Sequence, residues 1–179
     1  MEEVDIIKFT IADNLILKKV LGERIYYFYT EHLRVEAVGK EVSYWAPEYA
    51  LGLKVNRSDV SFINISADHS NSDKSATTYF KFEVGESKAP LRKEKLLQSG
   101  QYSEIKLYSS PVIMIEIYQD WNKEFEEKIM YDAALVFYTE SNRYLLKVRE
   151  QLIGGVDIII EEATIETMLS DLKLRQTLV

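Results

Sequence analysis

The segment Ser66–Thr78 is the longest polar stretch of the chain, and it holds residue types that could carry out chemistry. Asp68, His69 and Ser70 follow one another there, and Asp73 lies three positions further on. A carboxylate and an imidazole beside a hydroxyl have the composition of a nucleophilic triad, and oxygen ligands of this kind also bind divalent cations. Triad members, however, normally come from separate elements, and the segment lacks the glycine and the terminal glutamate of an EF-hand loop. We therefore expect a solvated hairpin tip, with Asp68, His69 and Asp73 as weak candidates for metal ligands.

The other titratable groups that could form a site are His32, the carboxylate pairs at 126–127 and 161–162, and the basic groups at 92–95 and 143–149. Adjacent carboxylates on a helix point about 100° apart, so neither pair converges on one substrate atom. The basic groups could hold a phosphate, but a solvated surface explains them as well. The chain contains no cysteine, which removes disulfides and thiolate metal sites. We expect no cofactor and no catalytic residue, and an enzymatic activity is the alternative.

Aromatic residues are the most unusual part of the composition. Twelve of the 179 residues are tyrosine, and tyrosine is enriched in strands and at protein interfaces. By strict alternation, Tyr27 and Tyr29 share one face of a strand with Ile25, and Tyr26 and Phe28 occupy the other face. A strand that is bulky on both faces lies within a sandwich, under a helix or at a contact surface.

A second aromatic group, formed by Tyr44, Trp45 and Tyr49, flanks Pro47, and we expect this stretch to be irregular. Exposed aromatic residues of this kind anchor protein interfaces, because they bring much area for few rotatable bonds. We predict that a partner binds at residues drawn from both groups, namely Tyr27, Tyr29, Tyr44, Trp45 and Tyr49.

The charge and hydropathy of the chain limit its partners and its location. The formal net charge is −7, which disfavours nucleic acid and suits a basic protein partner. The first residues lack the basic and apolar regions of a secretory signal. The longest purely hydrophobic run, Ala133–Tyr138, has six residues, far short of the ~18 that cross a bilayer. We expect a cytoplasmic protein with no membrane contact, folded as one domain over residues 1–179.

Alternating hydrophobicity predicts the elements that position these residues. Thr77–Val84 and Arg143–Arg149 have the clearest strand patterns, and we expect them to bury Phe80, Phe82, Tyr144, Leu146 and Val148. Weaker strand patterns cover Asp5–Ile11, Arg24–Thr30, Leu33–Val38, Val60–Ser66, Glu104–Tyr108, Val112–Tyr118 and Val156–Glu161. Short polar turns join several of them, which favours antiparallel pairing.

One helix is well specified near the end of the chain. Ile165, Met168, Leu169 and Leu172 form one apolar stripe, and Thr164 is a candidate N-cap. Lys173 and Arg175 would suit the C-terminal end of this helix. Further helix candidates are Asp120–Met130 and Pro90–Ser99, and Asn14–Leu21 is ambiguous between helix and strand.

These elements predict an α+β fold that is mostly β. We expect an antiparallel sheet system, either a sandwich or a partly open barrel, with a C-terminal amphipathic helix and one or two further short helices. The first functional hypothesis is a non-catalytic protein-binding or assembly domain, acting as an inhibitor or immunity-type partner of a basic protein, as a subunit of a larger complex, or as a homo-oligomer. The second is a small-molecule-binding barrel or sandwich with an aromatic-lined pocket, and such a protein could be an enzyme.

Overall fold

A computed structural model gives the three-dimensional structure of the chain. It describes residues 6–11, 14–30, 33–38, 41–46, 48–53, 62–72, 75–87, 103–107, 110–122, 128–149 and 155–179. The described elements follow the order β1 (Ile6–Phe9), α1 (Asn14–Lys18), β2 (Ile25–Thr30), β3 (Arg34–Val38), β4 (Glu41–Ala46), β5 (Glu48–Leu53), β6 (Phe62–Ser72), β7 (Ser75–Ser87), β8 (Ser103–Lys106), β9 (Val112–Asn122), β10 (Lys128–Thr139), β11 (Arg143–Val148), β12 (Val156–Ile159), α2 (Glu162–Leu169) and β13 (Lys173–Leu178).

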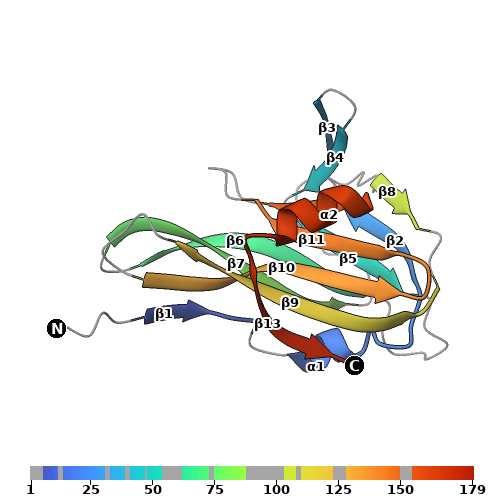
Figure 1. The fold of residues 1–179 in the computed structure, drawn as a ribbon, viewed down its shortest axis with the longest axis horizontal. Coiled ribbons are helices and arrows are strands. Elements are labelled where there is room, and N and C mark those ends of the chain that lie inside the picture. The colour runs from blue at the N-terminus through green and yellow to red at the C-terminus, as the bar shows by residue number, and fades with distance from the viewer. Residues whose placement is uncertain are drawn as a thin grey trace.

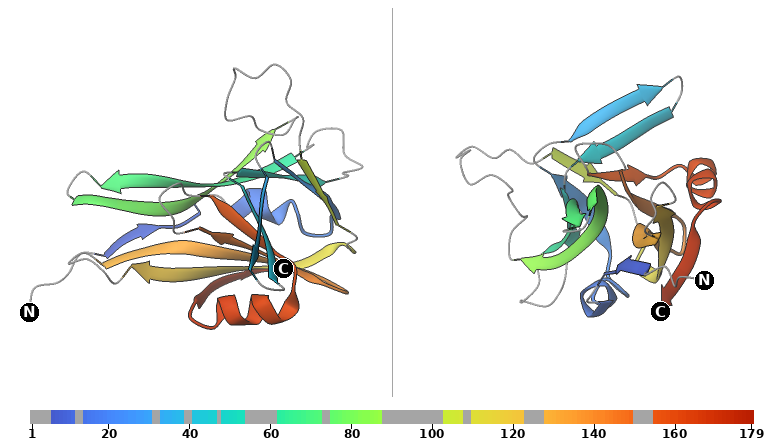
Figure 2. Two further views of the ribbon diagram at one scale, coloured as in Figure 1. Left: turned by 90° about the horizontal axis from the view of Figure 1, so that it is seen from above. Right: turned by 90° about the vertical axis from the view of Figure 1, so that its left-hand side faces the viewer.

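The strands form two sheets that face each other (Figures 1 and 2). Sheet A has eight strands in the order β13-β9-β10-β11-β12-β4-β3, with β1 parallel to the first half of β10. Sheet B has five strands in the order β7-β6-β5-β2-β8, and its pairings are antiparallel. Along the described elements the chain changes sheets four times, between β1 and β2, β2 and β3, β4 and β5, and β8 and β9. The expected mostly β fold with antiparallel sheets is confirmed.

Apolar side chains from the two facing surfaces form one core cluster. Sheet B contributes Ile25, Phe28, Ile63, Ile65 and Phe82, and sheet A contributes Ile115, Ile117, Leu135, Phe137, Tyr144, Leu146 and Val148. The rings of Phe28 on β2 and Tyr144 on β11 meet edge to face across the layers, with centroids 6.4 Å apart. The two clearest strand predictions are therefore confirmed, together with burial of Phe82, Tyr144, Leu146 and Val148. The side chain of Phe80 lies outside the described part of the structure.

Helix α2 covers the other face of sheet A. Its buried residues Ile165 and Leu169 pack on a second cluster formed by Ala134, Val136, Leu145 and Ile159. The central strands β10 and β11 are thus buried on both faces, which explains why β10 carries the longest hydrophobic run of the sequence. The seven weaker strand predictions each coincide with an observed strand, although their bounds differ.

The C-terminal helix exists but is shorter than its sequence pattern predicts. Met168 is 40 % exposed, so the buried stripe is narrower than expected, and Leu172 lies beyond the helix end. The N-cap is Glu161 rather than Thr164, whose hydroxyl instead donates to the Glu161 carboxylate. Lys173 and Arg175, expected at the helix end, belong to β13, because that segment pairs with the edge of β9.

The helix predicted at Asp120–Met130 is wrong where the structure describes it. Asp120–Asn122 ends β9 and Lys128–Met130 begins β10, and Asn122 pairs with Ile129 across the two strands. Cross-strand pairing has overridden a local helical spacing. The ambiguous segment near residue 14 forms helix α1, and the candidate helix Pro90–Ser99 lies outside the described residues. Within the described ranges, no helix is both long and apolar enough to cross a membrane.

Candidate functional site

Tyr27 and Tyr29 form an aromatic pair on the outer face of sheet B. Both side chains are half-buried, and their ring centroids are 5.4 Å apart with the planes inclined by 41°. In the register of β2 and β5, Tyr27 lies opposite Gly52 and Tyr29 lies opposite Ala50. The positions of β5 beside the two rings therefore carry small residues, whereas on the β8 side Tyr27 lies opposite Lys106 and Tyr29 opposite Glu104. We call this surface the Tyr27–Tyr29 face.

The faces of β2 differ from the strict alternation expected from the sequence. The register of β2 with β5 is irregular between Ile25 and Tyr27, which leaves Tyr26 as an extra residue. Ile25 therefore points inward together with Phe28, and both are fully buried. The prediction that Ile25 shares a face with Tyr27 and Tyr29 is wrong, because the bulge reverses the alternation before them.

The second predicted aromatic group is part of regular strands rather than an irregular stretch. Tyr44 and Trp45 belong to β4 and Tyr49 belongs to β5, on either side of a point where the chain changes sheets. Tyr44 is half-buried and packs against the main core. Tyr49 lies opposite Ile65 in the register, and the side chains of Trp45 and Tyr49 lie outside the described part. The structure therefore brings together Tyr27 and Tyr29 but assigns Tyr44 to packing.

The polar segment Ser66–Thr78 forms the paired end of the β6–β7 hairpin. Asp68 and His69 are neighbours on β6, and pairing continues along the two strands to Ser72. The hairpin is confirmed, but its unpaired tip is shorter than expected because the strands run further. Asp73 lies outside the described residues. Among the described residues, no three or more acidic or histidine side chains form a group that could hold a metal ion.

The other candidates are resolved only in part. The following lie outside the described residues: His32, Arg92, Lys93, Lys95, Glu126 and Glu127. Within the basic group on β11, Arg143 pairs with two glutamates of α2, and Arg149 lies 3.6 Å from a carboxylate oxygen of Asp157. These arginines are largely buried, with side chains 12 % and 11 % exposed, and are neutralised within the chain.

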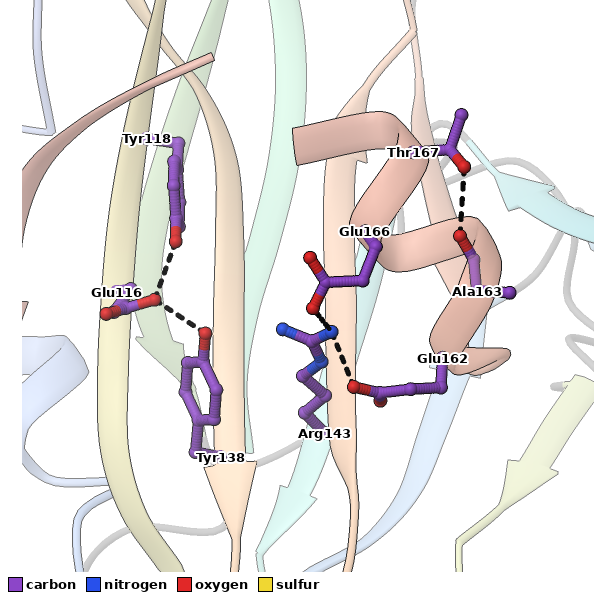
Figure 3. A network of polar contacts seen from close by, with 8 residues as sticks. All are labelled: Glu116, Tyr118, Tyr138, Arg143, Glu162, Ala163, Glu166 and Thr167. Atoms are coloured by element: carbon purple, nitrogen blue, oxygen red, sulfur yellow. Dashed lines mark hydrogen bonds and ion pairs between the residues drawn. The ribbon is translucent and has the colours of Figure 1, made fainter. Parts of the chain in front are cut away.

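A polar network that the sequence analysis missed lies on the outer face of sheet A (Figure 3). The hydroxyls of Tyr118 and Tyr138 both donate to Oε2 of Glu116, at 2.7 and 2.6 Å. Burial raises the pKa of the Tyr118 phenol, and its bond to the Glu116 carboxylate raises it further. Burial and the same carboxylate raise the pKa of Tyr138. Both phenols therefore remain protonated donors well above neutral pH.

Arg143 extends this network from the sheet to helix α2. One of its guanidinium nitrogens contacts Glu162 and Glu166, which lie one helical turn apart (Figure 3). The guanidinium also lies over the ring of Tyr138, 5.9 Å from the centroid. Burial alone lowers the pKa of Arg143, but the bonds to both glutamates and to Tyr138 outweigh it and raise the pKa. The cation is permanent, so the arrangement fastens α2 to sheet A and offers no activated nucleophile.

The sequence indicates part of this network. Glu116 and Tyr118 are two apart on one strand and so share a face, and Tyr138 and Arg143 flank a predicted turn. The approach of β9 and α2 to that turn depends on pairing over long distances in the chain. Local spacing does not contain this information.

A second polar cluster joins the two ends of the described chain. The Asp132 carboxylate is fully buried and accepts bonds from Nε and Nη2 of Arg175, at 2.7 and 2.8 Å. It also accepts the backbone N–H of Ile11 at 2.7 Å. Beside it, the Asn14 amide donates to Gln176 at 2.6 Å. This cluster anchors the edge strand β13 and the segment before α1 to the middle of sheet A.

Two register irregularities surround this cluster. The pairing of β10 with β9 is irregular around Ala133, and that of β13 with β9 is irregular around Arg175. Bulges of this kind turn a side chain away from the alternation of its strand. They explain how a charged pair enters an otherwise apolar layer with its hydrogen bonds satisfied.

Comparisons with known proteins add no relative to this description. The chain has no significant match among models of protein families, among curated proteins or among solved structures. The function is therefore inferred from the geometry of the chain itself.

Proposed function

We propose that this protein is a non-catalytic binding domain that docks to a protein through the Tyr27–Tyr29 face. The observation that carries the proposal is the position of the two rings, which are half-buried on the outer face of sheet B. Large aromatic side chains beside small residues offer a partner much contact area at low entropic cost. The two sheets then serve as the layers of a sandwich that holds this face rigid.

The burial of the described apolar residues between the sheets favours this proposal over the small-molecule alternative. The residues that point between the sheets are apolar and almost fully buried, among them Ile25, Phe28 and Ile63. A ligand-binding sandwich would place its aromatic residues around an interior space. Here Tyr27 and Tyr29 lie on the outside, and Tyr44 packs against the core.

The charge of the chain points to the nature of the partner. A net charge of −7 accelerates association with a basic protein and opposes association with acidic surfaces. Screening shortens the reach of this attraction to about 8 Å at 0.15 M salt. Affinity for a basic partner therefore falls as salt rises, whereas contact between identical acidic chains is strengthened by salt or left unchanged.

The experiment captures partners from native extract with three forms of the chain. These are the unchanged protein, the double variant Tyr27→Ser/Tyr29→Ser and the control Met168→Ser. Met168 is also partly exposed but lies on α2, against sheet A. We expect one partner to be retained by the unchanged protein and by the control, and to be lost with the double variant.

The captured partner is then purified and its affinity is measured between about 0.05 and 0.5 M salt. A decrease in affinity with rising salt agrees with a basic partner. Undiminished binding to the folded double variant would contradict docking through this face. An activity on a small molecule that is abolished by the same double variant would favour the alternative.

A further inference from the structure

The β3–β4 hairpin projects from the body of the molecule (Figures 1 and 2). Strand β4 is fixed to sheet A through the pairing of its end, Tyr44–Ala46, with β12. Strand β3 pairs with β4 along Arg34–Val38 and ends the strand order of sheet A. Within the described residues, the other edge of β3 therefore has no strand beside it. Such an edge presents backbone N–H and C=O groups that pair with another strand.

An exposed apolar residue lies near the start of this edge, as the second residue of β3. The Val35 side chain is 57 % exposed, although its cross-strand neighbour Tyr44 packs against the core. Directly opposite residues of an antiparallel pair lie on the same face of the sheet. Tyr44 and Val35 thus form an apolar row that begins at the core and stops at an open edge.

The residues on either side of Val35 carry opposite charges, Arg34 before it and Glu36 after it. This order is self-complementary in an antiparallel arrangement. If two copies of β3 pair with Val35 facing its equivalent, Arg34 of each copy lies opposite Glu36 of the other. A twofold axis then creates two opposite-charge pairs on one face and a valine pair on the other.

We propose that β3 is a self-association edge, where two copies of this chain pair antiparallel with Val35 at the twofold axis. The paired strands would join the two A sheets and extend the apolar row from Tyr44 of one copy to Tyr44 of the other. Arg34 has five donor N–H groups, so it adds a carboxylate from the second copy to the contacts it makes within its own chain.

The charges select this register among the alternatives. Centring the pair on Glu36 would place two carboxylates directly opposite each other, which is destabilising. A shift of one residue moves Val35 to the opposite face from its equivalent. Among these registers, the one centred on Val35 pairs both the charges and the apolar residues.

The strength of the association follows from the length of the edge. Stable dimers bury about 1,200–2,000 Å² in total, more than a single short strand pair centred on Val35 covers. We therefore expect a reversible dimer with a dissociation constant on the order of 100 µM. The proposal goes beyond the docking function and uses a different surface, so either can fail without the other.

Sedimentation equilibrium of the full chain at concentrations up to about 500 µM tests the proposal, since this range brackets the expected constant. The variants are Arg34→Glu, Glu36→Arg and the double variant that combines them. Lys173→Glu is the matched control, because it makes the same charge change at an exposed lysine on another edge strand. Circular dichroism establishes that each variant is folded.

We expect each single variant to weaken self-association at least about tenfold, because each turns two attractive pairs into repulsive ones. The double variant should dimerise like the unchanged protein, and so should Lys173→Glu. An equimolar mixture of the two single variants should form a heterodimer, since positions 34 and 36 are then both acidic in one chain and both basic in the other.

Three results would overturn the proposal. The first is an unchanged protein that stays monomeric over the whole concentration range. The second is a dimer that Arg34→Glu leaves intact. The third is a folded double variant, or a mixture of single variants, that fails to restore dimerisation. The double variant Tyr27→Ser/Tyr29→Ser should dimerise normally, so failure of the docking function gives a different pattern.

Discussion

Replacing Asp132 with asparagine should destabilise the fold strongly, although the side chain keeps its size. The carboxylate is fully buried and accepts two bonds from Arg175 and one from the backbone of Ile11. Asparagine keeps one acceptor oxygen, turns an N–H group toward these donors and removes the negative charge. Breaking one side of a buried ion pair costs about 3–5 kcal/mol. Because the Arg175 side chain is 21 % exposed and reaches water in part, we expect a loss near the lower limit, about 3 kcal/mol.

Urea unfolding followed by circular dichroism measures this loss. With a slope of about 2 kcal/mol per molar urea, the midpoint should fall by about 1.5 M. Asp120→Asn is the control, because Asp120 is half-buried and its side chain accepts the backbone N–H of Trp121. That change should cost less than about 1 kcal/mol. A loss below about 1 kcal/mol for Asp132→Asn, or equal losses for both variants, would refute the role of this pair as the anchor of β13.

Further changes test the helix, the phenol network and the histidines. Leu169→Ala should lower the free energy of unfolding by about 2–4 kcal/mol in denaturant melts, because it leaves a cavity in the second core cluster. Met168→Ala should lower it by less than about 0.5 kcal/mol, because Met168 is partly exposed. The pKa of Tyr118 is raised in the folded chain, so above about pH 10 the unfolded chain binds fewer protons than the folded chain and the stability of the fold falls as pH rises. Tyr118→Phe should make the melting temperature depend less on pH in this range. Replacing His32 and His69 together with Gln should leave partner binding unchanged, and a roughly 100-fold loss in a folded double variant would indicate a chemical role.

The sequence predicts the strands wherever inward apolar residues alternate with residues of other types along the chain. Arg143–Val148 is such a case, because its inward residues reach the core and its outward residues are charged or lie under α2. Strand β13 escapes prediction because it lies at an edge, and Leu178 is its only buried residue. Its basic residues, Lys173 and Arg175, are of the type that is typical of the C-terminal end of a helix. The local pattern of hydrophobic residues does not indicate with which edge of a sheet a segment pairs.

The candidate site likewise depends partly on patterns within one strand and partly on contacts between residues far apart in the chain. The local pattern predicts a strand at β2, but the bulge at Tyr26 determines which side of the sheet Tyr27 and Tyr29 occupy. The carboxylate of Glu116 and the buried Asp132 each find their partners through strands brought together by the whole fold. Charge and spacing along the chain identify neither of them.

The anchoring of both early and late segments on Asp132 has a consequence for biosynthesis. While the chain emerges from the ribosome, sheet A can bring together Ile11 and Asp132 but must wait for Arg175, which is made 43 positions later. Until then the edge of β9 is uncovered and a buried carboxylate lacks its counter-ion. An uncovered strand edge of this kind is open to aggregation. Synthesis of residues 173–178 is therefore the step that covers β9 and gives Asp132 its counter-ion, and a nascent chain stalled before that point leaves the β9 edge exposed.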